Sequence, residues 1–182
     1  LSVQVADVIT HSSDITGSYE YRTVHRPKYA EPGWFGGEVS VSGASSRLEW
    51  NAAYNHGLGR GAGNGGSIIS DQFGEITERR DVHSHFEGDF PSLSGSLKWF
   101  GPADTITNLN LEYSKEYTDF SNDEDRDLVT GIDQFRDFDN RGRGSSYEIG
   151  ADTEFGLGPG TLKLIGLESR EEHDFSSMSR LL

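Results

Sequence analysis

At 182 residues the chain fits a single domain of ordinary size, and its formal net charge of −14 argues against nucleic acid as a partner, because binding phosphates requires a basic surface. Aromatic residues make up 11% of the sequence, which argues against a disordered chain even though only 33% of the residues are hydrophobic. No cysteine is present, so a disulfide, a thiolate metal site and a cysteine nucleophile are all excluded.

Hydrophobicity alternates along the chain with a period of two. Between residues 107 and 113 the odd positions carry Thr, Leu, Leu and Tyr, and the even positions carry Asn, Asn and Glu. Strict alternation of this kind predicts a β-strand with one apolar and one polar face. Gly and Ser occur throughout, which disfavours helix. No apolar stretch approaches the roughly 20 residues of a transmembrane helix, whereas a closed β-barrel needs no such stretch.

Taken in chain order, the pattern predicts seven strands, at residues 17–26, 34–43, 46–56, 82–100, 104–120, 142–157 and 160–175. Several exceed the length of about 5 to 6 residues that is usual in globular proteins. Bacterial single-chain barrels normally have an even number of strands, so seven would not close unless residues 2–9 supply an eighth. We therefore expect a fragment of a larger barrel.

The connections between these strands are expected to be of two kinds. Three are short, at residues 43–46, 101–104 and 158–160, and three are long, at 27–33, 57–80 and 121–144. Short and long connections alternate, which is typical of outer-membrane barrels, where short turns lie in the periplasm and long loops lie outside. Aromatic residues near the expected strand ends predict two interfacial girdles, formed by Trp34, Phe35, Trp99, Phe100, Tyr117, Phe120, Tyr147 and Phe155.

The sequence thus predicts an all-β fold, an antiparallel up-and-down meander of about seven or eight long strands that is part of a larger transmembrane β-barrel. Three segments also resemble the first barrel hairpin of TonB-dependent outer-membrane receptors, most closely the large receptors common in alphaproteobacteria. They are GSYEYR at 17–22, RPKYAEP at 26–32 and WFGGEVSVSG at 34–43. The segment LSGSLKW at 93–99 and the hairpin at 158–167 are similar in style, and the resemblance covers about residues 14–175.

The resemblance implies a nutrient receptor of the bacterial outer membrane, with an N-terminal plug inside a barrel of about 22 strands. Such receptors bind a small-molecule nutrient, such as a ferric siderophore, haem, cobalamin or an oligosaccharide, and the TonB complex drives its import through the plug. The plug and the TonB box are missing from this chain. We assign residues 1–13 to a plug exit segment or linker and residues 14–182 to a partial barrel in contact with outer-membrane lipid, without a cofactor.

A metal site is one interpretation of His83, His85 and Glu87. The two imidazoles lie on one face of a strand, about 7 Å apart by the strand repeat. Two histidines and a carboxylate form a reasonable ligand set for a metal. The alternative interpretation is a set of polar residues at the base of an exterior loop, without a function of their own.

Other motifs give weaker indications. Asp123, Asp125 and Asp127 are spaced like the start of a calcium loop, but the glycine and glutamate of an EF-hand are absent, so a solvated acidic loop or a loose calcium site remains. The glycine-rich stretch 59–66 predicts a flexible exterior loop, since it lacks the Lys-Ser/Thr of a phosphate loop. Arg141 and Arg143 are candidates for an anionic ligand. No nucleophile elbow occurs, and we expect no enzyme.

Two other classes of protein stay open at this point. A small outer-membrane barrel, such as an eight-stranded adhesin or a porin, would need residues 2–9 to pair with 160–175. A soluble all-β module, for instance one that binds carbohydrate, would bury its apolar faces against each other. The exposure of tyrosine and tryptophan in mid-strand separates these alternatives, because such side chains are buried in a sandwich and face lipid in a barrel.

Overall fold

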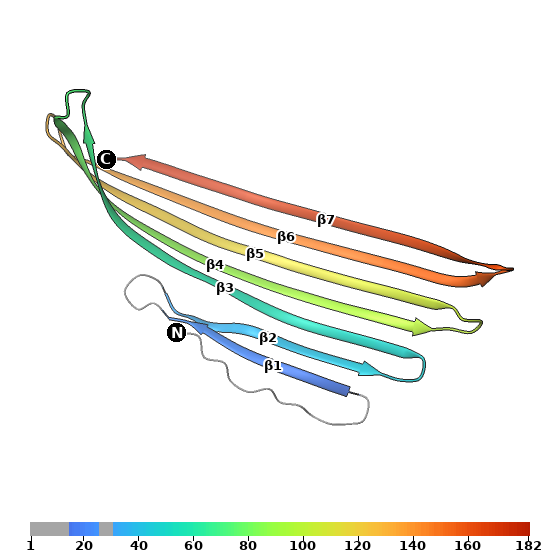
Figure 1. The fold of residues 1–182 in the computed structure, drawn as a ribbon. Coiled ribbons are helices and arrows are strands. Elements are labelled where there is room, and N and C mark those ends of the chain that lie inside the picture. Colours follow the sequence, from blue (N-terminus) through green and yellow to red (C-terminus); the bar gives the residue numbers. More distant parts are fainter. Residues whose placement is uncertain (1–14, 26–30) are drawn as a thin grey trace.

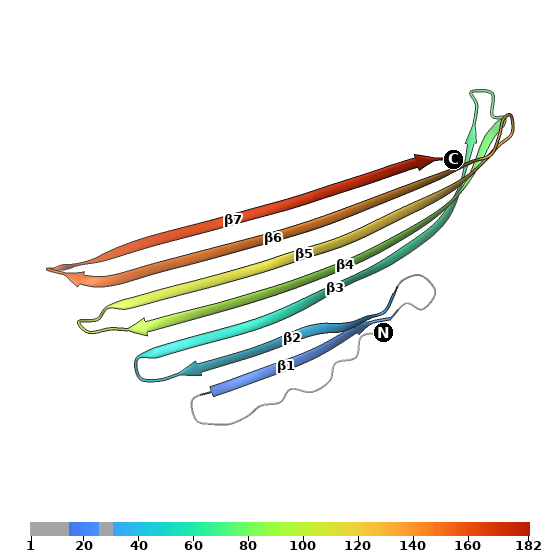
Figure 2. The same ribbon diagram turned by 180° about the vertical axis from the view of Figure 1, so that it is seen from behind.

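The computed structural model describes residues 15–25 and 31–182, which form one antiparallel sheet. Figures 1 and 2 show seven strands lying side by side in the order of the sequence. The strands are β1 (Ile15–Val24), β2 (Gly33–Ala44), β3 (Leu48–Ser70), β4 (Ile76–Phe100), β5 (Ile106–Leu128), β6 (Gln134–Leu157) and β7 (Gly160–Leu181). The predicted all-β meander of seven strands is confirmed. The assignment of residues 1–13 and the eighth strand at 2–9 lie outside the described residues.

Two of the three predicted long loops are wrong, because the strands continue through them. β3 runs on to Ser70 and pairs with β4 along its whole length, and β5 and β6 pair in the same way between residues 106 and 154. The hydrophobic alternation stops there because both faces become polar or glycine-rich, yet the backbone hydrogen bonds of the ladder do not depend on side chains. The third predicted loop, 27–33, lies partly outside the described residues.

Tight turns therefore join the strands at both ends of the sheet. At the end that we call proximal, residues 45–47, 101–105 and 158–159 make the three predicted short turns, and Gly158 has a φ of 60°. At the opposite, distal end, β3 and β4 are joined by residues 71–75. The Asp71 carboxylate accepts hydrogen bonds there from the backbone N–H groups of Phe73 at 2.8 Å and Glu75 at 3.0 Å. Each strand from β3 to β6 is thus joined to its two neighbours by a tight turn at either end.

The sheet has a face that we call the tyrosine face, with a continuous apolar band on its proximal half. The register sets one row across six strands, formed by Tyr19, Val39, Tyr54, Leu93, Tyr113 and Tyr147. Closer to the proximal turns, a second row includes Trp50, Leu97 and Leu109. Most of these side chains are solvent-exposed, for example Tyr54 at 46%, while Trp50 and Tyr147 are half-buried. Of the predicted girdle residues, Phe100 and Phe120 lie on the other face, and Tyr147 lies in mid-strand.

No second layer covers either face of the sheet within the part of the chain that the structure describes. No hydrophobic residue there is buried, so the sheet has no core of its own. The two outer strands, β1 and β7, each have one edge without a partner among the described residues, and the sheet does not close. No helix long and apolar enough to cross a membrane occurs in the described residues. The apolar band thus needs a cover from outside this sheet.

The pairing of β3 with β4 near the distal end can be tested with introduced cysteines, since the chain has none. Gly65 and Val82 are register partners with side-chain positions on the same face. We expect Gly65→Cys with Val82→Cys to form a disulfide in most molecules, because the Cα spacing of antiparallel partners fits a disulfide. Thiol labelling under oxidising conditions measures this.

The matched control is Gly65→Cys with Asp81→Cys, where Asp81 is the register partner of Gly66 and points to the opposite face. This pair should remain reduced. Similar oxidation of both pairs would mean that residues 57–80 form a mobile loop instead of a hairpin.

Candidate functional site

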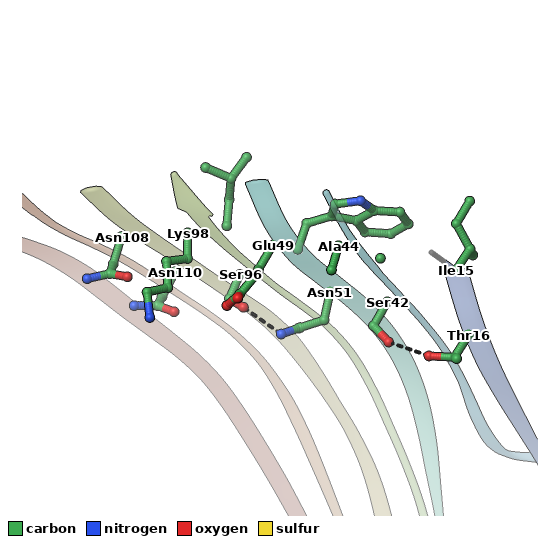
Figure 3. A pocket seen from close by; sticks show the side chains of 13 residues that line it. Ile15, Thr16, Ser42, Ala44, Glu49, Asn51, Ser96, Lys98, Asn108 and Asn110 are labelled. Atoms are coloured by element: carbon green, nitrogen blue, oxygen red, sulfur yellow. Dashed lines mark hydrogen bonds between the residues drawn. The ribbon is translucent and has the colours of Figure 1, made fainter. Parts of the chain in front are cut away.

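The other face, which we call the serine face, is polar in its proximal half. Hydroxyl and amide side chains pair across the strands, for example Thr16 with Ser42 at 2.8 Å, Ser18 with Ser40 at 2.6 Å and Ser114 with Ser146 at 2.7 Å. A hollow of about 530 Å³ lies here, and Figure 3 shows the side chains that line it, most of them on the serine face. These cross-strand pairs make the proximal serine face wettable and leave hydroxyl and amide groups available to water or solute.

Further along the serine face lies a phenylalanine zone, formed by Phe86, Phe90, Phe120 and Phe138. Phe86 stands opposite Phe120 in the register, and the rings of Phe120 and Phe138 are 6.3 Å apart in an edge-to-face arrangement. Phe86 and Phe90 lean over the glycines of β3. A Cβ added to Gly59 would approach the Phe86 ring at 2.9 Å, so a side chain at this position would displace the ring.

The glycine-rich stretch at 59–66, predicted as a flexible loop, is instead part of β3. At Gly59 the absence of a side chain leaves room for the Phe86 ring, whereas a Cβ at Gly65 would meet nothing within 4 Å. Aromatic rings that cover strand glycines compensate for the weak packing of a residue without a side chain.

The distal end of the serine face carries an arginine cluster, formed by Glu78, Arg80, Glu124, Arg126 and Arg136. Glu78 accepts from Arg80 Nε at 2.6 Å and from Arg126 Nε at 2.5 Å, each guanidinium making a second bond at 3.2 Å. Arg136 lies 3.8 Å from Glu124. Glu78 is the one buried charged residue among the described residues, at 8% exposure. One carboxylate thereby holds two guanidinium groups side by side.

These hydrogen bonds from Arg80 and Arg126 lower the pKa of Glu78 to about 2 from a usual value of 4.5. A lowered pKa in the folded state means that the ionised carboxylate stabilises the fold at pH values above about 4.5. The contribution is lost as the pH falls from there towards 2, where Glu78 becomes protonated even in the folded protein.

The predicted metal ligands all lie on β4, on the distal half of the tyrosine face. His85 Nε2 lies 3.2 Å from Glu87 Oε1, which also accepts from the Glu31 N–H at 3.2 Å. His83 contacts Asn64 instead, at 3.1 Å. The structure brings His85 and Glu87 together but not His83, and within residues 15–25 and 31–182 no three potential ligands gather around one point. A site with all three ligands stays a prediction.

Asp123, Asp125 and Asp127, for which a solvated acidic loop or a loose calcium site was open, lie in strand β5 instead of a loop. Asp123 faces His83 on one side and Asp137 on the other, and Asp125 faces Asp81. Burial and the nearby carboxylates of Asp137 and Asp139 raise the pKa of Asp123. Side chains two residues apart on a strand are about 7 Å apart, so the three aspartates do not converge as calcium ligands do.

Arg141 and Arg143 lie on the tyrosine face and share one carboxylate. Arg143 Nη2 lies 2.9 Å and Arg141 Nε 3.4 Å from Asp119, and the Arg143 guanidinium lies 5.7 Å from the Tyr117 ring centroid. Their charge is partly neutralised there. The anion-binding geometry of the chain is better developed on the opposite face, in the arginine cluster that sequence reasoning missed.

Comparison with known proteins adds no identity. No protein-family model matches the chain, and neither a curated protein nor a solved structure matches it. The resemblance to TonB-dependent receptors therefore stays a prediction, and any assignment of function depends on the geometry of the two faces.

The pH dependence of stability tests the Glu78 network. We expect Glu78→Gln to lower the urea midpoint of unfolding at pH 7, because the variant loses a charged acceptor shared by two arginines. The difference from wild type should shrink as the pH falls from about 4.5 towards 2. Glu75→Gln, in the neighbouring turn, serves as the control and should show no such pH window. If the difference in urea midpoint between Glu78→Gln and wild type stayed constant from about pH 4.5 to about pH 2, this would contradict the network.

Proposed function

We propose that the chain is part of a β-barrel of the bacterial outer membrane that acts as a TonB-dependent nutrient receptor. The observation that carries the proposal is the apolar band on the tyrosine face, which no described residue covers. A soluble sandwich would bury such a band against a second sheet. In a membrane the cover is lipid, and a sheet with no core of its own becomes stable once it closes.

The length of the band can be compared with the thickness of a bilayer. On β5 the apolar positions extend from Thr107, in the row of Trp99, to Tyr113, and Lys115 follows on the same face before Tyr117. The six steps to Tyr113 are about 20 Å along the strand and the ten steps to Tyr117 are about 33 Å, or about 15 and 25 Å of height at a strand tilt of about 40°. Outer-membrane barrels have an apolar band of about 25 Å, so Lys115 would lie in the distal interface, where a lysine extends its ammonium group to the headgroups. The distal part of β5, with Asp119, Asp123 and Asp125, would then project beyond the membrane.

Aromatic residues lie at both borders of this band. Tyr54, Tyr113 and Tyr147 form the distal border, and Trp50 and Trp99 lie near the proximal border. Tyrosine and tryptophan prefer the interface because the ring is apolar while the hydroxyl or indole N–H reaches polar headgroups. This arrangement supports an interfacial girdle at each membrane surface.

The serine face would line the interior of the barrel. Its hydroxyl, amide and carboxylate groups suit contact with water, with a plug and with a small-molecule nutrient on its way through. Coupling to the TonB complex would pass through an N-terminal plug, so energy for import would come from outside this segment. The chain's part in this scheme is binding and passage, without catalysis or a cofactor.

Cell fractionation with mass spectrometry tests the proposal. We expect peptides of this chain in the outer membrane, in a band several times heavier than the chain, and cross-linked to TonB after treatment of living cells with formaldehyde. An outer-membrane band of the chain's own mass, without the cross-link, would favour a small barrel or porin. A soluble protein would favour the carbohydrate-binding module and contradict both membrane assignments.

Arginine substitutions test which face meets lipid. Leu111 lies in the middle of the apolar band, 41% exposed, and Asn110 beside it points to the serine face. Leu111→Arg should destabilise the folded protein in phospholipid vesicles by about 2–4 kcal/mol, the cost of an arginine near the midplane of the bilayer. Asn110→Arg is the matched control and should cost much less, because it faces the interior, where substitutions change selectivity and not lipid contact. Urea titration followed by gel shift without heating measures both, and equal costs would exclude a lipid-facing band.

A further inference from the structure

We propose that the distal half of the serine face binds a small anionic ligand with a flat aromatic body. The arginine cluster would hold the anionic group, and the phenylalanine zone would pack against the body. The inference rests on the proposed function and deepens it, since it names the chemical class of the cargo.

The arginine cluster presents cations to solvent and keeps its carboxylates underneath. The side chains of Glu78 and Glu124 are 11% and 14% exposed, whereas those of Arg80, Arg126 and Arg136 are 29%, 22% and 44% exposed. A guanidinium has five N–H donors, and Arg80 and Arg126 each use two of them on Glu78. Donors thus remain for a further acceptor at the surface of the cluster.

The charge of the cluster has the opposite sign to that of the whole chain. Three arginines and two glutamates leave a local charge of 3 − 2 = +1, in a chain of net charge −14. A fork of guanidinium groups matches carboxylate, sulfonate and phosphate oxygens in a bidentate manner. Glu78 acts as a positioning residue, because it fixes the Nε atoms of two arginines on one carboxylate.

The aromatic part of the site begins directly beside the cluster. Arg136 and Phe138 are two residues apart on β6, which places them on the same face about 7 Å apart. Phe138 in turn contacts Phe120, and Phe120 stands opposite Phe86. On β4, Arg80 and Phe86 are six residues apart, about 20 Å. A ligand about 10–20 Å long can therefore reach both the guanidinium groups and the rings.

The site also selects against a neutral apolar molecule. The arginine N–H groups would lose water without gaining an acceptor if such a molecule covered them, and an unpaired charged group is costly. An anion lacking an aromatic body would leave the phenylalanine rings in water. Both halves together favour a ligand that carries an anionic group at one end of a flat apolar surface.

Ligand binding by nuclear magnetic resonance tests this inference on the full-length protein in zwitterionic nanodiscs. The probe is naphthalene-2-carboxylate, and naphthalene-2-carboxamide is its uncharged counterpart, with empty nanodiscs as the blank. We expect the carboxylate to bind at least tenfold more tightly than the carboxamide. Arg136→Gln should weaken the carboxylate about fivefold with little effect on the carboxamide, and Phe138→Leu should weaken both probes.

Arg141→Gln is the matched control, since Arg141 lies on the same strand and points to the opposite face. It should leave binding unchanged. Arg126→Gln is a second test of the cluster. If this variant fails to fold because it loses its bonds to Glu78, Arg136→Gln still tests the cluster, because Arg136 lies beside Glu124 instead. Equal binding of the two probes, no binding, or equal effects of Arg136→Gln and Arg141→Gln would overturn the inference. Fractionation to the outer membrane is a separate readout, so the proposed function can stand while the ligand class fails, and the reverse.

Discussion

Each side chain in this sheet can point to only one of two faces, and antiparallel register passes that choice from strand to strand. Tyr113 points away from Ser114, so Tyr147 and Leu93, its partners, point away from Ser146 and Ser92. Separation of apolar from polar groups therefore extends over the width of the sheet without any core. The backbone ladder provides the framework, and the two faces differ only in what they leave uncovered.

The serine face changes character along the strands, from hydroxyl pairs at the proximal end through phenylalanine rings to ion pairs at the distal end. Glycine in β3 is part of this change, because Phe86 occupies the space that a side chain at Gly59 would need. Glu78 likewise allows Arg80 and Arg126 to lie side by side, because the two positive charges would repel each other without its carboxylate. A gradient of this kind gives a long strand different chemistry at each depth, while the tyrosine face keeps a simpler division into apolar and charged halves.

Sequence patterns predicted the proximal half of the sheet well and the distal half poorly. Alternation between Leu109, Asn110 and Leu111 marks β5 clearly, because one face there needs apolar residues. No such demand acts on residues 57–70 or 121–128, where both faces carry polar groups or glycine, so strand and loop look alike in composition. In the arginine cluster, Glu78 bonds to Arg126, which lies 48 positions further along the chain. Only the register of the strands shows that these two residues are neighbours.

The strict meander has a consequence for how the sheet forms. Every described strand pairs with its neighbours in sequence, and from β2 onward each new hairpin closes across a turn of only a few residues. The entropy lost in closing such a turn is small, and pairing can then spread outward like a zipper, one residue pair after another. The long β3–β4 and β5–β6 hairpins thus become kinetically accessible even though each strand has more than 20 residues. Assembly would proceed hairpin by hairpin, without a search among distant segments for a partner.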